Sequence, residues 1–278
     1  MLKCFAFLLY VLSNSLLAQV TYEESRQASI TIGKWLSKST GHYDFLSATP
    51  VATKRGGEHF SIVGSPNIQT ASDYGISYAQ VPRDNNVTSA YQVLGFDTSD
   101  FSHTIDLTRF QLSLGFDHKH DFTFSYLTST DGISGWGVGY KRVLLDYRHF
   151  FFSYRAQYAR SKLDAYFDNM SITNDLSASL HFQLIDIYSG IRHSMGRLNF
   201  DSSIPQLSLP QVNFFSKLSE MEFFYGVVLS TSLNSRLTFQ LNQIGEEYSL
   251  AGKFSLHFDS LLPTINGWFR DPRYIKQW

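Results

Sequence analysis

Cysteine is almost absent from this chain of 278 residues, where Cys4 is the only one. It lies inside a segment that reads as a secretory signal, so a mature chain would contain no cysteine. Small secreted domains that lack a large core are usually held together by disulfides. The composition therefore favours a fold closed by its own backbone hydrogen bonds over a disulfide-stapled domain.

Long apolar runs and a surplus of charge are also missing. Beyond the N-terminus, no segment approaches the roughly 18 consecutive apolar residues of a membrane helix. A membrane protein of this composition could only be a closed β-barrel, because lipid cannot satisfy an open strand edge. The chain has 23 basic and 24 acidic residues, a net charge of −1, and no basic cluster. Nucleic acid is therefore not expected as a partner.

The first 18 residues have the three parts of a signal peptide. Lys3 supplies a positive charge, residues 5–12 are apolar, and small residues lead to a cut after Ala18. We therefore expect a signal peptide at 1–18, a barrel at 19–258, and a C-terminal tail at 259–278 that is periplasmic or plugs the barrel. The expected location is the outer membrane of a Gram-negative bacterium.

What the chain does contain is a repeated alternation of apolar with small or polar residues, in runs of about ten. One run places Phe110, Leu112, Leu114 and Phe116 on the same side of a strand, because successive side chains point to opposite faces. Strands of roughly 9–11 residues are long enough to cross a bilayer. Aromatic residues, which form girdles at the membrane interfaces, make up 16% of the chain.

A soluble sandwich or a lipocalin-like barrel would also alternate, but its outer face would carry charges. Here the residues opposite the apolar face are often small. The run 135–140 places glycines opposite Trp136, Val138 and Tyr140. The alternation therefore favours an all-β, transmembrane, antiparallel up-and-down barrel.

We predict about fourteen strands, with twelve as the alternative. The expected strands are 28–37, 42–49, 57–63, 73–81, 88–96, 104–116, 121–128, 134–145, 148–160, 177–193, 197–204, 220–231, 236–243 and 248–258. Short turns are expected on the periplasmic side, at 117–120, 145–147, 194–196 and 232–235, and longer loops on the other, among them 161–175 and 205–219. The apolar phase slips within 180–191, which we interpret as a β-bulge.

The polar face of the strands carries the candidate lumen residues. The positions predicted to contact a solute are Arg109, Lys141, Arg155, Arg236, Lys253, Glu222 and Gln240. Five bases against one clear acid predict a mild preference for anions. No motif indicates a cofactor. The two histidines of the turn at 118–120 are fewer than the four ligands usual for a metal, so no metal site is expected.

This architecture resembles monomeric outer-membrane channels of twelve or fourteen strands, some of which move acidic sugars along lumenal arginines. The resemblance rests on strand count and lumen charge over the whole mature chain. It implies a narrow pore for small solutes. It also implies outer-membrane lipid, lipopolysaccharide and the barrel-assembly machinery as partners.

Two other functions stay open. A lipid-modifying hydrolase of the outer membrane would place a serine and a histidine on the lipid-facing wall, and the nearest pair in the sequence is His193 with Ser194. These neighbours would point to opposite faces of a strand. The other possibility is a non-catalytic surface barrel that binds a partner through its apolar loops at 161–175 and 205–219.

Overall fold

The structure is a computed structural model. It describes residues 22–41, 47, 49, 51, 70–83, 85–99, 102–116, 119–163, 167–182, 184–201, 213–231, 235–244 and 247–258. The expected signal peptide at 1–18 and the tail at 259–278 lie outside these residues. Among the helices described, none is long and apolar enough to cross a membrane.

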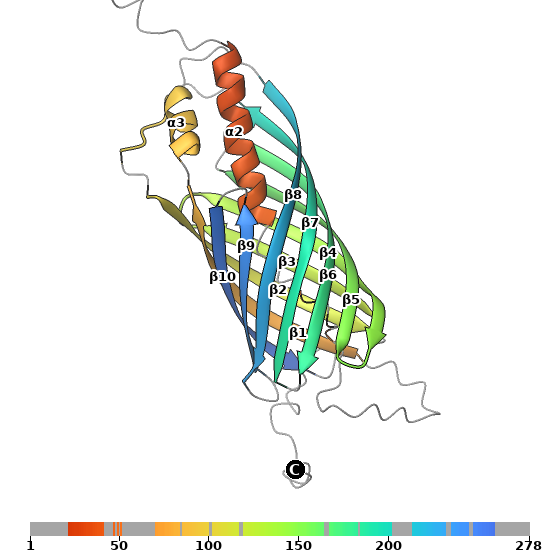
Figure 1. Ribbon diagram of the computed structural model, residues 1–278. Coiled ribbons are helices and arrows are strands. Elements are labelled where there is room, and N and C mark those ends of the chain that lie inside the picture. The colour runs from red at the N-terminus through yellow and green to blue at the C-terminus, as the bar shows by residue number, and fades with distance from the viewer. Residues whose placement is uncertain are drawn as a thin grey trace, which may run out of the picture.

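Ten antiparallel strands form a closed barrel in which each strand pairs with its neighbour in sequence and β1 pairs with β10 (Figure 1). The strands are β1 (Thr70–Pro82), β2 (Thr104–Phe116), β3 (His120–Ser129), β4 (Ile133–Tyr147), β5 (Phe150–Leu163), β6 (Phe167–Phe182), β7 (Ile185–Asp201), β8 (Asn213–Ser230), β9 (Ser235–Ile244) and β10 (Glu247–Phe258). The all-β, up-and-down class is thus confirmed, and closure leaves neither β1 nor β10 as an open edge.

The predicted count of about fourteen strands, or twelve, is wrong, partly because two expected strands are helical. The segment 28–37 lies within α2 (Tyr22–Gly41), and 88–96 overlaps α3 (Asn85–Val93) and the turn after it. Both helices bury residues at helical spacing, such as Ile32 and Leu36. The expected strand 57–63 and most of 42–49 lie outside the described residues.

The phase slip within 180–191 is a hairpin turn rather than a β-bulge. β6 ends at Phe182, β7 begins at Ile185, and the two strands pair in continuous register as far as Phe182 with Ile185. The turn keeps Phe182 and Ile185 on the same outer face, which explains why the apolar phase shifts by one residue. Two other expected connections are also wrong. The expected loop at 161–175 is mostly strand, because it belongs to the end of β5 and the start of β6. The expected turn at 194–196 lies within β7.

The two faces of the barrel have opposite chemistry. Large apolar side chains are exposed on the outside, such as Phe124, Trp136 and Ile187. Side chains that face inward are mostly polar and buried, such as Gln111, Ser153 and Thr173. An apolar outside and a polar inside are the arrangement that a bilayer imposes on a membrane barrel.

The two ends of the barrel differ in their connections. At one end, here called the turn end, the strands are joined by short connections after β2, β4, β6 and β8, and the barrel also begins and ends there. The opposite end, the loop end, carries the long β1–β2 connection with α3. Short turns are periplasmic in bacterial outer-membrane barrels, so the loop end is the one expected to face outward from the cell.

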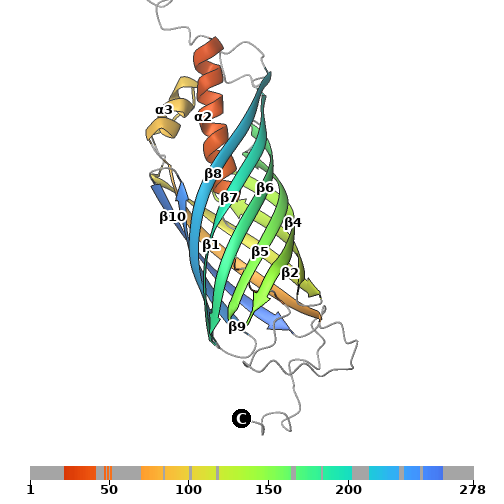
Figure 2. The ribbon, with the colours of Figure 1, turned by 45° about the vertical axis from the view of Figure 1, so that its right-hand side comes forward.

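Helix α2 occupies the barrel at the loop end. It runs from beyond the rim into the interior, with its C-terminal end deepest, and α3 lies beside it at the rim (Figures 1 and 2). The described residues between α2 and β1, which are Ser47, Thr49 and Val51, lie farther toward the turn end. They contact β3, β4 and β7 there. α2 and these three residues therefore lie inside the barrel, and they precede the first strand in the chain.

Candidate functional site

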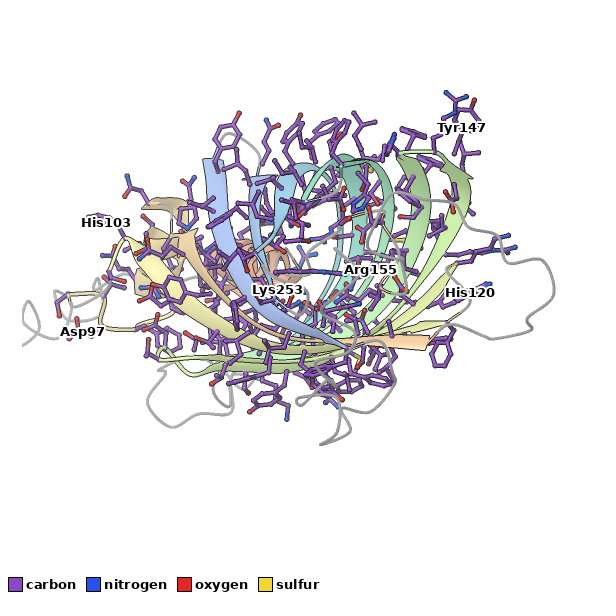
Figure 3. The ribbon with its side chains drawn as sticks, turned by 90° about the horizontal axis from the view of Figure 1, so that it is seen from below. Asp97, His103, His120, Tyr147, Arg155 and Lys253 are labelled. Carbon is purple, nitrogen blue, oxygen red and sulfur yellow. The ribbon has the colours of Figure 1, made fainter. Side chains whose placement is uncertain are left out.

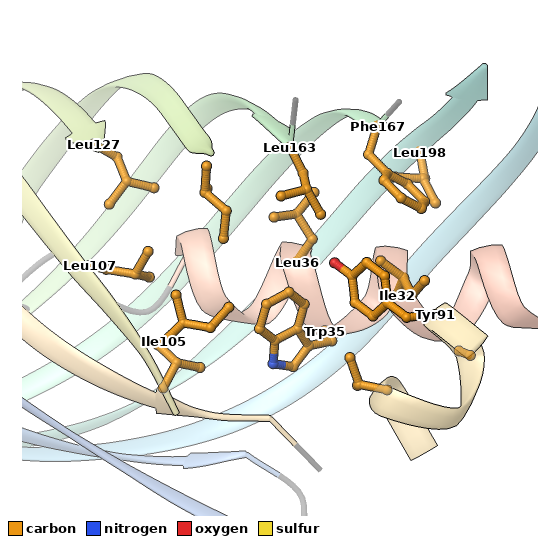
Figure 4. Packing of buried hydrophobic residues seen from close by; sticks show 14 of the residues in the cluster. Ile32, Trp35, Leu36, Tyr91, Ile105, Leu107, Leu127, Leu163, Phe167 and Leu198 are labelled. Atoms are coloured by element: carbon orange, nitrogen blue, oxygen red, sulfur yellow. The ribbon is translucent and has the colours of Figure 1, made fainter. Parts of the chain in front are cut away.

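At the loop end the interior is filled by apolar packing around α2. Ile32 and Leu36 are fully buried against inward-facing residues of the strands, among them Leu107, Leu163 and Leu198 (Figure 4). Gly33 allows the closest approach, because a Cβ at that position would lie 2.1 Å from Cδ2 of Leu198. The helix is thus held in the barrel by close packing of complementary apolar surfaces, which excludes water.

Three polar contacts fix α2 in this seat. The indole Nε1 of Trp35 donates to the carbonyl of Pro82 at 2.9 Å. Near the inner end of the helix, the hydroxyls of Thr40 and Ser161 are 3.2 Å apart. Arg109 donates to the carbonyl of Thr40. Because the last carbonyls of a helix have no partner within it, a charged donor at this position stabilises the end of α2.

Toward the turn end, the chain is held by charged groups instead of apolar packing. Lys141 Nζ donates to the carbonyls of Thr49 at 2.7 Å and Ser47 at 3.1 Å, and it forms an ion pair with Asp121 at 2.8 Å. Asp121 also accepts from the backbone N–H of Val51 at 3.1 Å. The hydroxyl of Ser47 donates to Asp186 at 2.5 Å. We call α2 together with Ser47, Thr49 and Val51 the plug.

A cavity of about 90 Å³ remains in this half of the interior. Its basic and acidic lining residues are Lys141, Arg155, Arg236, Lys253, Asp73, Asp121 and Asp186. The cavity is polar and large enough for several waters, since one water needs roughly 10–15 Å³ measured this way. It is smaller than the roughly 300–1,000 Å³ of typical small-molecule sites. Beside the described residues of the plug, the turn-end half of the interior thus keeps a small polar cavity.

All seven residues predicted to line the lumen face inward. They are Arg109, Lys141, Arg155, Glu222, Arg236, Gln240 and Lys253, of which the cavity collects Lys141, Arg155, Arg236 and Lys253. Figure 3, seen from the turn end, shows Arg155 and Lys253 inside the ring of strands and Tyr147 outside it. Gly139 makes room for Arg155, since a Cβ there would lie 3.3 Å from the guanidinium. Contact of these residues with a solute stays a prediction.

The expectation of one clear lumenal acid is wrong. Asp73, Asp121, Asp175 and Asp186 are buried on the inner face beside Glu222. Several form ion pairs, including Arg192 with Asp175 at 2.8 Å and Lys253 with Asp73 at 3.1 Å. Asp121 could have been recognised from the sequence, because it alternates with the outward Phe122 and Phe124. Asp175 and Asp186 fall where the sequence was interpreted as a loop and a bulge.

The other candidate sites are not assembled by the structure. His193 faces outward and Ser194 is buried on the inner face, so the two do not form one site. His120 stacks on Tyr140 and bonds its hydroxyl at 2.6 Å, while His118 lies outside the described residues. No group of three possible metal ligands occurs among the residues that the structure describes.

The β1–β2 connection carries Asp97 and His103, which lie outside the barrel wall in Figure 3. The backbone N–H of Ser99 donates to the Asp97 carboxylate at 2.9 Å and holds the pKa of that carboxyl below its usual value. This bond is a local turn contact. It stabilises the turn that begins at Asp97.

No protein-family model matches the sequence, and no curated protein matches it. Among solved structures, the outer membrane protease OmpT from Escherichia coli superposes with a TM-score of 0.39 at 8% identity, over 68% of this chain and 96% of that one. The translocator domain of the autotransporter NalP from Neisseria meningitidis gives 0.39 at 6%, over 70% and 90%. The KdgM porin gives 0.37 at 7%, over 68% and 98%.

These similarities are too low to carry a functional argument. The class follows from the chain's own structure, which is a closed barrel with an apolar outer wall, a polar interior, and short turns at one end. Only a bilayer gives that outer wall a favourable environment. The chain therefore has the fold of a transmembrane β-barrel, the class that spans the outer membrane of Gram-negative bacteria.

Proposed function

We propose that this protein is a narrow channel for small solutes that is closed by its own plug. The supporting observation is the uneven attachment of the plug. In the turn-end half, Lys141 and Asp121 hold the chain through hydrogen bonds and an ion pair beside a polar cavity. Water can replace such contacts at low net free energy. Withdrawal of the plug would join the polar lining of the turn-end half to the loop end, where the inner wall is apolar.

The proposed selectivity is weak and favours anions. The charged residues of the cavity are four bases and three acids, so the preference rests on an excess of one positive charge. That is less than the sequence predicts, because Asp73, Asp121 and Asp186 neutralise most of the basic side chains. The reversal potential in a salt gradient should therefore show a small anion preference. Changing Arg155 and Arg236 together to Ser should reverse it.

A reversible disulfide across the plug gives the sharpest test of gating. Thr40 and Ser161 have hydroxyls 3.2 Å apart, so Thr40→Cys with Ser161→Cys brings two thiols within bonding reach. The only native cysteine is Cys4, which the expected signal cleavage removes. In planar bilayers, the reduced double variant should open transiently and the oxidised one should stay closed. The Thr40→Cys single variant should not respond to oxidation.

A second variant distinguishes a channel that the plug closes from a barrel that cannot conduct at all. Deletion of residues 22–41 removes the helix from the interior while leaving all ten strands. If the variant migrates as a folded barrel on heat-modifiability gels, it should conduct continuously. Absence of conductance in both this variant and the reduced disulfide variant would reject the channel proposal.

A further inference from the structure

The outer wall carries a row of polar side chains where the bilayer should meet apolar ones. Tyr154 on β5, Asn174 on β6, His193 on β7 and Ser219 on β8 all face outward on four consecutive strands. We call these four residues the outer polar row. Polar and ionisable groups exposed to lipid are unfavourable, and their presence calls for a functional explanation.

Hydrogen bonds join the row in two pairs, His193 with Ser219 and Tyr154 with Asn174. Nε2 of His193 and the hydroxyl oxygen of Ser219 are 3.1 Å apart. Asn174 pairs with His193 directly across the strands, and its Oδ1 accepts from the hydroxyl of Tyr154 at 2.6 Å. A carbonyl oxygen has a second lone pair, so Asn174 can also accept from the other ring nitrogen of His193. Such a bond would orient the imidazole with Nε2 toward the serine.

A serine within hydrogen-bond reach of a histidine is the usual arrangement of an activated nucleophile and its base. Here Ser219 is exposed, and the surrounding wall is apolar, with Met195, Met221 and Phe223 all exposed. An apolar surface beside a nucleophile suits a substrate that carries hydrocarbon chains.

The depth of the row indicates which bond of a lipid it would reach. On β7, His193 lies two outward positions on the turn-end side of the exposed Arg197, and Ile187 lies farther toward the turn end. Four residues span at most about 13 Å along a strand, and less in depth because the strands tilt. The pair therefore lies just inside the outer edge of the apolar band, where acyl esters of outer-leaflet lipids are located.

We propose that Ser219 and His193 form a catalytic pair that hydrolyses carboxylic esters of outer-leaflet lipids. Ser219 Oγ attacks the acyl carbonyl carbon as its proton passes to His193 Nε2. The ester C–O bond then breaks, and His193 returns the proton to the leaving alcohol. A water molecule, deprotonated by His193, attacks the acyl carbonyl carbon of the acyl-serine, the bond to Ser219 Oγ breaks, and His193 returns the proton to that oxygen. The products are a fatty acid, an alcohol and the regenerated hydroxyl, so no other reactant is consumed.

The test uses the full-length protein, folded in detergent, with two substrates in separate arms: diacyl phosphatidylethanolamine in mixed micelles, and purified lipopolysaccharide. Free fatty acid is measured by mass spectrometry. We expect release in at least one arm, which also identifies the lipid. A fluorophosphonate probe should label Ser219, and peptide mapping locates the label.

The matched variants separate catalysis from structure. Ser219→Ala should abolish labelling and lower release at least about 100-fold. His193→Gln can still hydrogen-bond Ser219 but cannot act as a base, so it should lose release while the barrel stays folded. Ser189→Ala is the control, since Ser189 is also exposed on β7 but pairs with Ala178 and Tyr225 rather than with a histidine.

Asn174 is a positioning residue in this proposal. Asn174→Leu should lower release, and Asn174→Asp should restore most of it, because the carboxylate keeps an acceptor facing the imidazole. The proposal is overturned if the folded wild-type protein releases no more fatty acid than Ser219→Ala in either lipid arm. Lipid binding without release would overturn it equally, as would unchanged release in His193→Gln.

Discussion

The two halves of the interior hold the same stretch of chain by different means. At the loop end, α2 is seated by apolar side chains such as Ile32 and Leu36, with few charges. At the turn end, Ser47, Thr49 and Val51 are held by Lys141, Asp121 and Asp186. Apolar packing resists exchange with water, whereas hydrogen bonds can be exchanged one by one. We therefore expect the plug to loosen first at the turn end.

The largest expected loss of stability comes from removing the charge of Lys141, which holds the plug in the turn-end half. Lys141→Met leaves Asp121 buried without its ion pair and takes the donor from two plug carbonyls. Loss of one partner of a buried ion pair weakens the folded state by about 3–5 kcal/mol. Hydrogen exchange at Val51 should accelerate strongly, while exchange within α2 should change little. If hydrogen exchange accelerates equally at Val51 and within α2, the two halves of the interior do not hold the plug independently.

The corresponding change at the loop end is Leu36→Ala. Truncating a fully buried leucine typically lowers the free energy of unfolding by about 2–5 kcal/mol. Limited proteolysis should then cut α2 while the barrel remains intact on heat-modifiability gels. Lys34→Ala is the control, because Lys34 is exposed on the same helix. If Lys34→Ala is cut as fast as Leu36→Ala, apolar packing of Leu36 is not what holds the helix.

A smaller effect is expected where α2 approaches the wall most closely. Gly33→Val places a side chain into space occupied by Leu198 and should destabilise the seated helix by about 1–3 kcal/mol. Leu198→Ala alone leaves a cavity, and the double variant should recover part of the loss. A double-mutant cycle based on thermal unfolding measures this coupling. If the two changes in the free energy of unfolding simply add, the contact between Gly33 and Leu198 does not determine how firmly the helix is held.

The smallest effect is expected on the outside of the barrel. Arg160 donates to Asp168 at 2.9 Å, and both side chains are partly exposed. Exposed pairs contribute about 0–1 kcal/mol, so Arg160→Met should barely change thermal unfolding. A large loss of stability in this variant would mean that charge pairs on the outer wall matter as much as those inside.

The sequence predicts the barrel wall better than its contents. β2 occupies 104–116 as predicted, because an apolar outer face and a polar inner face impose strict alternation. The same alternation assigns Arg109, Arg155 and Gln240 correctly to the interior. It fails at the β6–β7 turn, where Leu184 is apolar and exposed and no Gly, Pro, Asn, Asp or Ser stands at positions 183–184 to mark the turn.

The helices show a different kind of failure. Val87, Ala90, Tyr91 and Leu94 have the i, i+3, i+4, i+7 spacing of a buried helix face, so α3 could have been recognised from this signal. α2 was harder to recognise, because its environment is the inside of a barrel that other segments build. Its seat depends on Leu163 and Leu198, which are more than 120 residues away in the sequence. A one-dimensional pattern contains no information on that partner.

The threading of the N-terminal segment also constrains the order of assembly. The seam between β1 and β10 closes through nine register pairs, from Ser72 with Phe258 to Gln80 with Leu250. A helix that precedes β1 in the chain and lies inside the barrel is most simply enclosed if it is already between the strands when β1 and β10 pair. Biogenesis would then begin with capture of α2 by the unfinished sheet and end with the meeting of the first and last strands. A mutation in α2 could consequently slow membrane insertion even where the finished barrel tolerates it.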